Sequence, residues 1–175
     1  EDGIRDVAVT EVQTCALPIF RAALPAPWQC WLDESPRLDW LNQDLAALGM
    51  EPTPPDPAHD PCRDLVLADP LAALGSLYVV EGSALGGQVI VRTLSPHPDL
   101  APALRYFRGH GEDTGVRWRR FCALLSSMDS LQADPEQVPD ARWTTAVQAA
   151  NDTFDALCRA ALQQRPDRGE PVAAG

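Results

Sequence analysis

The sequence predicts an all-α fold in a single domain. Apolar side chains recur every three to four residues in several stretches, and no stretch keeps the strict alternation of a half-buried strand. Prolines and glycines gather between these stretches, where they mark helix ends and connectors. The length of 175 residues suits one domain with one core, and the 45% content of hydrophobic residues is typical of globular proteins.

The first predicted helix covers about residues 36–48. Ser35 is expected to be its N-cap, Pro36 its first residue, and Gly49 its end. Its apolar stripe comprises Leu38, Leu41, Leu45 and Leu48. Five prolines within residues 51–61 then predict a connector, because proline lacks an amide donor and disfavours helix before it.

A long apolar helix is predicted next, opened by Asp69 as cap and Pro70 in the first turn, and running to about Leu94. Its longest uncharged runs, 70–80 and 82–91, are separated by Glu81. A membrane-spanning helix needs about 20 mostly apolar residues, so a buried core helix is the better interpretation.

Three further helices complete the predicted bundle, a short one at about 101–107 and longer ones at about 114–131 and 139–163. Their spacing predicts an inward stripe of Val116, Trp118, Phe121, Leu124, Leu125 and Met128 in the second. In the third it predicts one of Trp143, Val147, Ala150, Phe154, Leu157 and Leu162. Residues 166–175 are expected to form a flexible tail.

Charge and cysteine usage exclude several function classes. The 14 basic residues are all Arg and face 25 acidic ones, so the net charge is −11. Without Lys there is no Schiff-base or P-loop chemistry, and an acidic chain disfavours nucleic-acid binding. Five widely spaced cysteines indicate neither a disulfide framework nor a zinc site. Reduced thiols and the lack of a secretory pattern favour the cytoplasm.

The long helix carries four glycines, Gly75, Gly82, Gly86 and Gly87. Together they cost roughly 3–4 kcal/mol of helix propensity relative to alanine. Three of them fall within an arc of roughly 40°, which leaves a stripe of bare backbone. This stripe suits either close packing of another helix or the approach of a flat ligand.

The residues of this helix resemble those of a known family. The segment 74–94, and above all its core Glu81-Gly82-Ser83-Ala84-Leu85-Gly86-Gly87-Gln88, is similar to the distal haem helix of haem oxygenases. It is closest to the bacterial branch that makes biliverdin for bacteriophytochromes. Weaker similarities occur in the expected order at 41–49, 107–121 and 149–154, so that about residues 36–163 are covered.

The resemblance implies that haem is both cofactor and substrate, and that it is cleaved oxidatively to biliverdin, carbon monoxide and ferrous iron. Gly82, Ser83 and Gly86 would be the catalytic distal residues. Ser83 stands where many members have an Asp that holds distal water, so the route of proton delivery is open. The haem-binding residues implied are Gly82, Ser83, Gly86, Gly87, Arg117, Arg119 and Phe154.

Haem propionates need cations, and the Arg117, Arg119 and Arg120 cluster lies on the helix that supplies them in the family. Arg119 is the first choice, beside Trp118. The alternative is a solvated basic turn. Implied partners are an electron donor, such as ferredoxin or a flavoprotein reductase, and a bacteriophytochrome as biliverdin acceptor.

The family's proximal histidine has no counterpart in an N-terminal helix here. His59, His97 and His110 lie in a connector, a proline turn and a glycine loop, where surface positions are expected. Residues 1–19 resemble a translated sequencing adapter, which makes 20–165 a haem-oxygenase-like domain that lacks its first, proximal helix. We therefore expect no metal ligand in this chain, weak haem binding and impaired turnover.

Two alternatives stay open. The first is a non-enzymatic interaction module whose glycine stripe packs a partner helix. The second is a relative with the same helical fold and a different small ligand, as in thiamine salvage. The spacing of Cys122, Cys158 and Glu81 does not assemble the constellation that those relatives use.

Overall fold

The computed structural model describes residues 21–24, 26–51, 65, 69–131 and 139–163, and every regular element within them is helical. The predicted all-α class is therefore confirmed. The helices are α2 (Ala26–Asp33), α3 (Arg37–Ala47), α4 (Pro70–Leu94), α5 (Arg105–Arg108), α6 (Thr114–Leu131) and α7 (Pro139–Gln163), with the short 3-10 turns η1 (Ala101–Ala103) and η2 (Gly111–Asp113).

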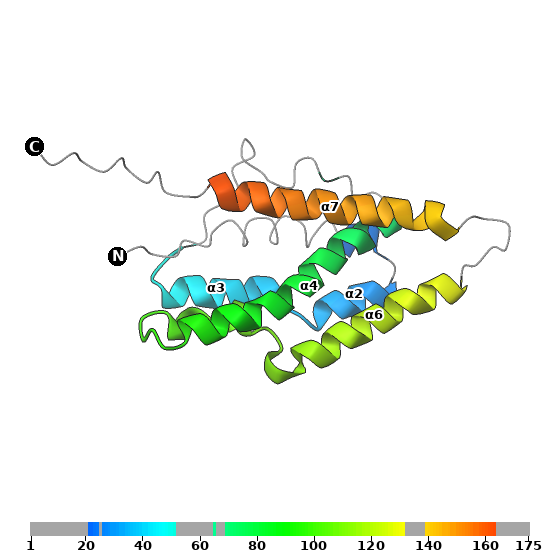
Figure 1. Ribbon diagram of the computed structural model, residues 1–175. Coiled ribbons are helices and arrows are strands. Elements are labelled where there is room, and N and C mark those ends of the chain that lie inside the picture. The colour runs from blue at the N-terminus through cyan, green and yellow to red at the C-terminus, as the bar shows by residue number, and fades with distance from the viewer. Residues whose placement is uncertain (1–20, 25, 52–64, 66–68, 132–138, 164–175) are drawn as a thin grey trace, which may run out of the picture.

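The long helix α4 is the centre of the arrangement. In Figure 1 it runs diagonally through the molecule, with α7 crossing it on one side and α2 and α6 on the other. It contacts α5, α6 and α7, while α3 contacts α5 and η1. The main core is shared by α2, α4 and α6 and contains Leu24, Trp28, Trp31, Ala73, Leu74, Leu77, Val80 and Phe121.

The ends of α4 and α3 follow the sequence signals in two cases. The side chain of Asp69 accepts hydrogen bonds from the amides of Leu71 and Ala72, as expected of a cap before Pro70. Gly49 ends α3 with a φ of 67°, a conformation that glycine adopts without steric cost. Both predictions are confirmed.

The prediction for Ser35 is wrong. Pro36 is the N-cap of α3, no side chain caps that helix, and the hydroxyl of Ser35 instead bonds Nε2 of His110 at 2.8 Å. The helix α2 was not predicted, because Ala26–Asp33 is too short for a clear period. It nevertheless supplies two tryptophans to the core.

The inward face predicted for α7 is also wrong in part. Val147 and Phe154 are 58% and 59% exposed, whereas the buried face consists of Ala146, Ala149, Thr153 and Ala156. Small residues face inward because α7 lies close to α4 at Gly75, where an added Cβ would collide with the Ala146 carbonyl. On α6, Val116 and Leu124 are likewise exposed rather than inward.

Several expectations fall outside the described residues. They concern the leader 1–19, the tail 166–175, His59 and the connector beyond residue 51. The side chains of Met128 and Leu162 are not described either. The predicted short helix at 101–107 is divided between η1 and α5.

Helix α4 is long and apolar enough to span a membrane by composition, with 39% of its most apolar window buried inside the protein. The same helix carries Glu81, which is buried in ion pairs with arginines of two other helices. Its contacts with α5, α6 and α7 are those of a core helix, so it gives no indication of a membrane protein.

Candidate functional site: the glycine face of α4

The four glycines of α4 fall into two groups. Gly75 and Gly87 are packed against backbone: a Cβ on Gly75 would collide with the Ala146 carbonyl, and one on Gly87 would lie 2.7 Å from the carbonyl oxygen of Phe107. These two glycines allow α7 and α5 to approach α4 closely. The packing interpretation of the stripe therefore holds for Gly75 and Gly87.

The other two glycines are not needed for packing. A Cβ on Gly82 would make an ordinary contact of 3.5 Å with the Trp118 ring, and one on Gly86 would meet nothing within 4 Å. Exposed apolar side chains share this face of α4 at helical spacing, and they are Tyr78, Leu85 and Val89. The result is a bare backbone surface bordered by apolar groups, which is the kind of surface that a flat apolar ligand can contact.

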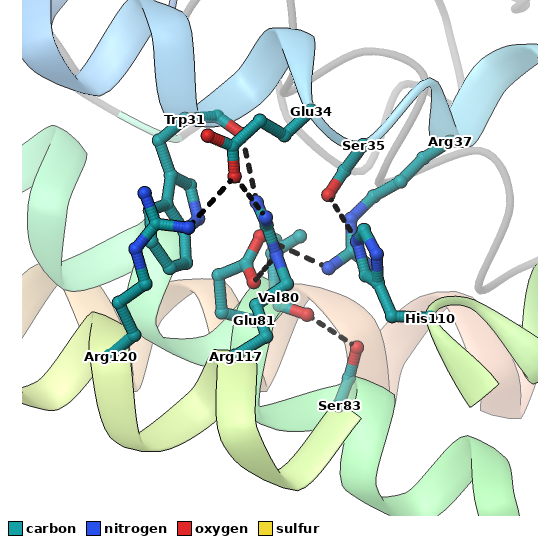
Figure 2. A network of polar contacts seen from close by, with 10 residues as sticks. All are labelled: Trp31, Glu34, Ser35, Arg37, Val80, Glu81, Ser83, His110, Arg117 and Arg120. Carbon is teal, nitrogen blue, oxygen red and sulfur yellow. Dashed lines mark hydrogen bonds and ion pairs between the residues drawn. The ribbon is translucent and has the colours of Figure 1, made fainter. Parts of the chain in front are cut away.

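A buried ionic cluster lies on another side of the same helix, around Glu81 (Figure 2). The carboxylate of Glu81 accepts a hydrogen bond from Arg37 of α3 at 3.1 Å and one from Arg117 of α6 at 3.4 Å. All three side chains are at least nine-tenths buried. A carboxylate at this depth is tolerated because two guanidinium groups compensate its charge.

Arg117 extends the cluster to α2. Its guanidinium donates to the carboxylate of Glu34 at 2.7 Å and to the carbonyl oxygen of Trp31 at 2.8 Å, and it stacks over the Trp31 ring. Arg120 also pairs with Glu34, at 3.5 Å. These contacts hold Arg117 inside the bundle rather than at an open edge.

Arg119 differs from its neighbours, because it is exposed and forms no ion pair with any described residue. Of the cations predicted for an anionic ligand edge, it is the one whose guanidinium is available. The predicted roles of Arg117 and Arg119 remain predictions, but their surroundings are opposite.

The remaining predicted residues lie at different distances from the bare face. Ser83 is on α4 beside Gly82, and its hydroxyl donates to the carbonyl oxygen of Val80 at 2.7 Å. Phe154 is on α7 next to Thr153, whose hydroxyl lies 2.7 Å from that of Ser76. The Phe154 side chain is 59% exposed.

Gln88, which follows the bare segment along the chain, attaches α4 to neighbouring elements. Its side-chain amide donates to the carbonyl oxygen of Arg108 at 3.0 Å and lies 3.3 Å from the hydroxyl of Thr114. Beside it, Gly87 lies against the Phe107 carbonyl. The C-terminal half of α4 is thus attached to α5 and to the start of α6.

The described histidines are His97, in the turn after α4, and His110, in the loop between α5 and η2. His97 is exposed in the turn after α4, about 20 Å along the helix from Gly82. His110 is partly buried, bonds Ser35 and makes an edge contact with Trp40. Burial lowers the pKa of His110, and Arg117 and Arg37 lower it further. His110 is therefore only partly at the surface, where a surface position was expected.

The sequence analysis missed two buried polar side chains where α3 meets α5, Asp44 and Tyr106. The carboxylate of Asp44, in α3, accepts hydrogen bonds from the backbone amides of Arg105 and Tyr106, each at 2.7 Å. It thereby caps the start of α5 from another helix. Burial raises the pKa of Asp44 in spite of these bonds. The Tyr106 hydroxyl is buried without a hydrogen-bond partner among the described residues, and burial raises its pKa to about 12.

One sequence signal pointed to this arrangement. Glu81 is the single charged residue in a run of apolar and small residues. A carboxylate at such a position must either be exposed to solvent or be paired with a cation. Its partners Arg37 and Arg117 lie 44 and 36 residues away in sequence. Pairing at such separations is decided by the packing of helices, which local spacing does not reveal.

Comparison with known proteins agrees with the resemblance to haem oxygenases. A heme oxygenase of Xanthomonas campestris pv. campestris (strain 8004) is 44% identical to this chain over 90 residues. Over these residues the chain is a homologue of a haem oxygenase. The match covers 51% of the chain, and the chain spans about half the length of this curated relative. No family model and no solved structure matches the chain.

Proposed function

We propose that this chain is a haem-oxygenase-type domain whose haem-facing surface is the bare face of α4. The observation that carries the proposal is Gly86, where an added Cβ would meet no atom within 4 Å although the first half of the same helix is built into the core. The homology to a heme oxygenase over half of the chain supports it.

The residues present fit a macrocycle on this face. Gly82 and Gly86 allow backbone to approach its plane, and Tyr78, Leu85 and Val89 supply apolar contact at the border. Bound haem supplies iron that activates dioxygen and the ring that is opened to biliverdin, with release of carbon monoxide and ferrous iron. Backbone at Gly82 and Gly86 would lie close to the bound macrocycle and would exclude bulky groups from that side.

The polar residues of this chain have separate tasks in the proposal. The Ser83 hydroxyl, which donates to the Val80 carbonyl oxygen, would help to order water beside the bare face. The exposed guanidinium of Arg119 can pair with a propionate. Arg117 is committed to Glu34 and Glu81, so we give it a positioning task instead.

The described histidines, His97 and His110, both lie outside the N-terminal helices in which the family has its ligand, so we propose weak haem binding and impaired turnover for the chain as given. The test is a titration with hemin, with and without added imidazole as a substitute ligand, followed through the Soret band. We expect imidazole to tighten hemin binding and to sharpen the band. A sharp histidine-ligated spectrum without imidazole, with biliverdin formed on reduction, would contradict the missing ligand.

Gly86→Leu tests the position of the macrocycle. A leucine at this open position would occupy the bare face without disturbing the core, and we expect hemin binding to weaken at least about tenfold. Ala47→Leu, at an exposed position of α3, is the matched control and should bind hemin as the unaltered chain does. Equal hemin binding by both variants would remove Gly86 from the site.

The wider functional setting follows the same proposal. Electrons come from an external donor such as ferredoxin or a flavoprotein reductase, the protein acts in the cytoplasm, and a bacteriophytochrome accepts the biliverdin. Reduction of the hemin complex with a ferredoxin system and with a flavoprotein reductase, followed by pigment analysis, tests the donor.

A non-enzymatic interaction module is the second candidate, favoured by the exposure of Tyr78, Leu85 and Val89 beside the bare glycine. Such a surface also suits close packing of a partner helix. Sedimentation of the Gly86→Leu variant separates the two. Loss of an oligomer with unchanged hemin binding favours the module, and loss of hemin binding with unchanged mass favours the enzyme.

A further inference from the structure

In the second half of α4, few residues are buried, so apolar packing holds this half only weakly. Beyond Val80, only Glu81 and Gly87 are buried up to the end of the helix at Leu94. The intervening residues 82–86 are exposed or partly exposed, and two of these five are glycines. Helix propensity and core packing, the two usual sources of helix stability, are both weak in this segment.

Polar anchors replace packing on either side of the segment. Glu81 is bonded to Arg37 and Arg117, which come from α3 and α6. Gln88 is bonded to the Arg108 carbonyl, in α5, and lies within hydrogen-bond distance of Thr114, in α6. The two anchors therefore attach the same stretch of helix to three others.

The anchors also share one side of the helix. Residues seven apart differ by only about 20° in direction, so Glu81 and Gln88 point the same way, whereas Gly82 and Gly86 lie about 100–140° away from Glu81. Holding both anchors fixes the rotation of α4 about its axis. That rotation decides whether bare backbone or the side chains of Leu85 and Val89 face a ligand.

We infer that Glu81 and Gln88 are positioning residues. Their polar contacts hold the segment 82–86 at both ends and keep its bare face directed outward. Arg37 and Arg117 act through Glu81. The inference deepens the proposed function, since the segment that it positions is the haem-facing one. Charge-assisted hydrogen bonds are directional whereas apolar contacts are not, so the two anchors fix the direction of this segment more closely than apolar contacts alone would.

The first test uses no haem. Hydrogen exchange of the amides of residues 82–87 is measured in the whole chain and compared with amides of 72–77 in the same helix. Glu81→Gln should speed exchange at 82–87 at least about tenfold more than at 72–77. Glu112→Gln, which makes the same chemical change at an exposed site, is the matched control and should change neither. Equal acceleration of both segments would overturn the inference.

Because Glu81→Gln removes one buried charge and leaves two arginines, it can unfold the chain. A second variant therefore replaces the whole ionic cluster. In the variant Arg37→Met, Glu81→Met, Arg117→Met the whole triad becomes apolar, a replacement that often preserves stability. We expect this variant to fold and still to exchange amides of 82–87 at least about tenfold faster than the unaltered chain. Exchange at the unaltered rate would overturn the inference, because packing alone would then position the segment.

The Gln88 anchor is tested in the same way. Gln88→Met should speed exchange at 82–87, and Gln43→Met, at an exposed position of α3, should not. Unchanged exchange in Gln88→Met would overturn its part in the inference.

Hemin binding then separates this inference from the proposed function. In the titration with imidazole, Glu81→Gln should bind hemin about tenfold more weakly and give a broader Soret band than Glu112→Gln. If the unaltered chain does not bind hemin, the proposed function fails, while amide exchange still decides the anchoring by itself. If exchange rises but hemin affinity and band width do not change, the positioning role is overturned.

Discussion

The two halves of α4 are built differently. Residues 70–80 are held by apolar packing: Ala73, Leu74, Leu77 and Val80 are almost fully buried among α2, α6 and α7. Residues 81–94 bury only a carboxylate and a glycine. One continuous helix therefore changes from an apolar core element to a surface element held by polar contacts.

The glycines show what this difference means. Gly75, in the first half, is required because the α7 backbone occupies the place of a side chain. At Gly86, in the second half, the place that a side chain would occupy is empty. The same residue type serves close packing in one half and leaves a surface bare in the other, so composition alone does not assign its task.

The largest expected effect concerns the ionic attachment of the second half. Among the described residues, Arg117→Met leaves Glu81 with Arg37 alone and removes the Arg117 hydrogen bond to the Trp31 carbonyl, and we expect the free energy of unfolding to fall by about 3–5 kcal/mol. Arg119→Met, two residues away and exposed, should change it by no more than about 0.5 kcal/mol. Urea denaturation of both variants is the measurement. Similar losses in the two would mean that the buried cluster contributes no more than a surface charge.

The glycine comparison predicts the next largest effect. Gly75→Ala places a methyl group against the Ala146 carbonyl, and we expect a loss of about 1–3 kcal/mol in the free energy of unfolding. Gly86→Ala meets nothing and gains helix propensity, so it should stabilise the chain by up to about 1 kcal/mol. Thermal denaturation of the pair distinguishes them, and stabilisation by Gly75→Ala would contradict the close approach of α7.

A third prediction uses pH to probe the cluster beside the second half. The pKa of His110 is lowered by burial and by Arg117, Arg37 and Arg105, against an opposing effect of Glu81. The unfolded chain therefore takes up a proton below about pH 6.5 where the folded chain does not. The free energy of unfolding should be independent of this group above about pH 6.5 and should fall as the pH is lowered further.

The measurement is urea denaturation between about pH 7.5 and 5.5, with His110→Gln and His97→Gln compared. His110→Gln should reduce the pH dependence, whereas His97→Gln, at the exposed turn after α4, should retain it. A stability that rises on acidification only in the presence of His110 would reverse the sign and refute the assignment.

The smallest effect is expected at Tyr106. Its buried hydroxyl has no partner among the described residues, so Tyr106→Phe removes no hydrogen bond and should change the free energy of unfolding by between 0 and about 1 kcal/mol in the stabilising direction. Thr153→Val is the contrasting variant, because the Thr153 hydroxyl lies 2.8 Å from the Ala149 carbonyl oxygen. Its loss should cost about 1 kcal/mol, and a larger loss in Tyr106→Phe would indicate a bound water.

The sequence was sufficient for local features. The Asp69–Pro70 start of α4, the Gly49 end of α3 and the boundaries of α6 and α7 follow from capping residues and helical period, which act within a few residues. The core segment around Glu81 was also enough to indicate similarity to haem oxygenases, which the comparison with a curated relative supports. The roles predicted for Gly82, Ser83, Gly86, Arg119 and Phe154 stay predictions.

The tertiary structure decided which side of each helix is buried. Spacing placed Val147 and Phe154 inside, but the close approach of α7 to Gly75 leaves room only for Ala146, Ala149 and Thr153. It also decided that Ser35 bonds His110 rather than its own helix, and that Arg117 is buried with Glu81 while Arg119 is exposed. Capping and helical period act over a few residues of one chain segment, whereas steric fit and charge pairing act between helices. For that reason the sequence by itself determined where the helices lie, and only their packing determined what each face does.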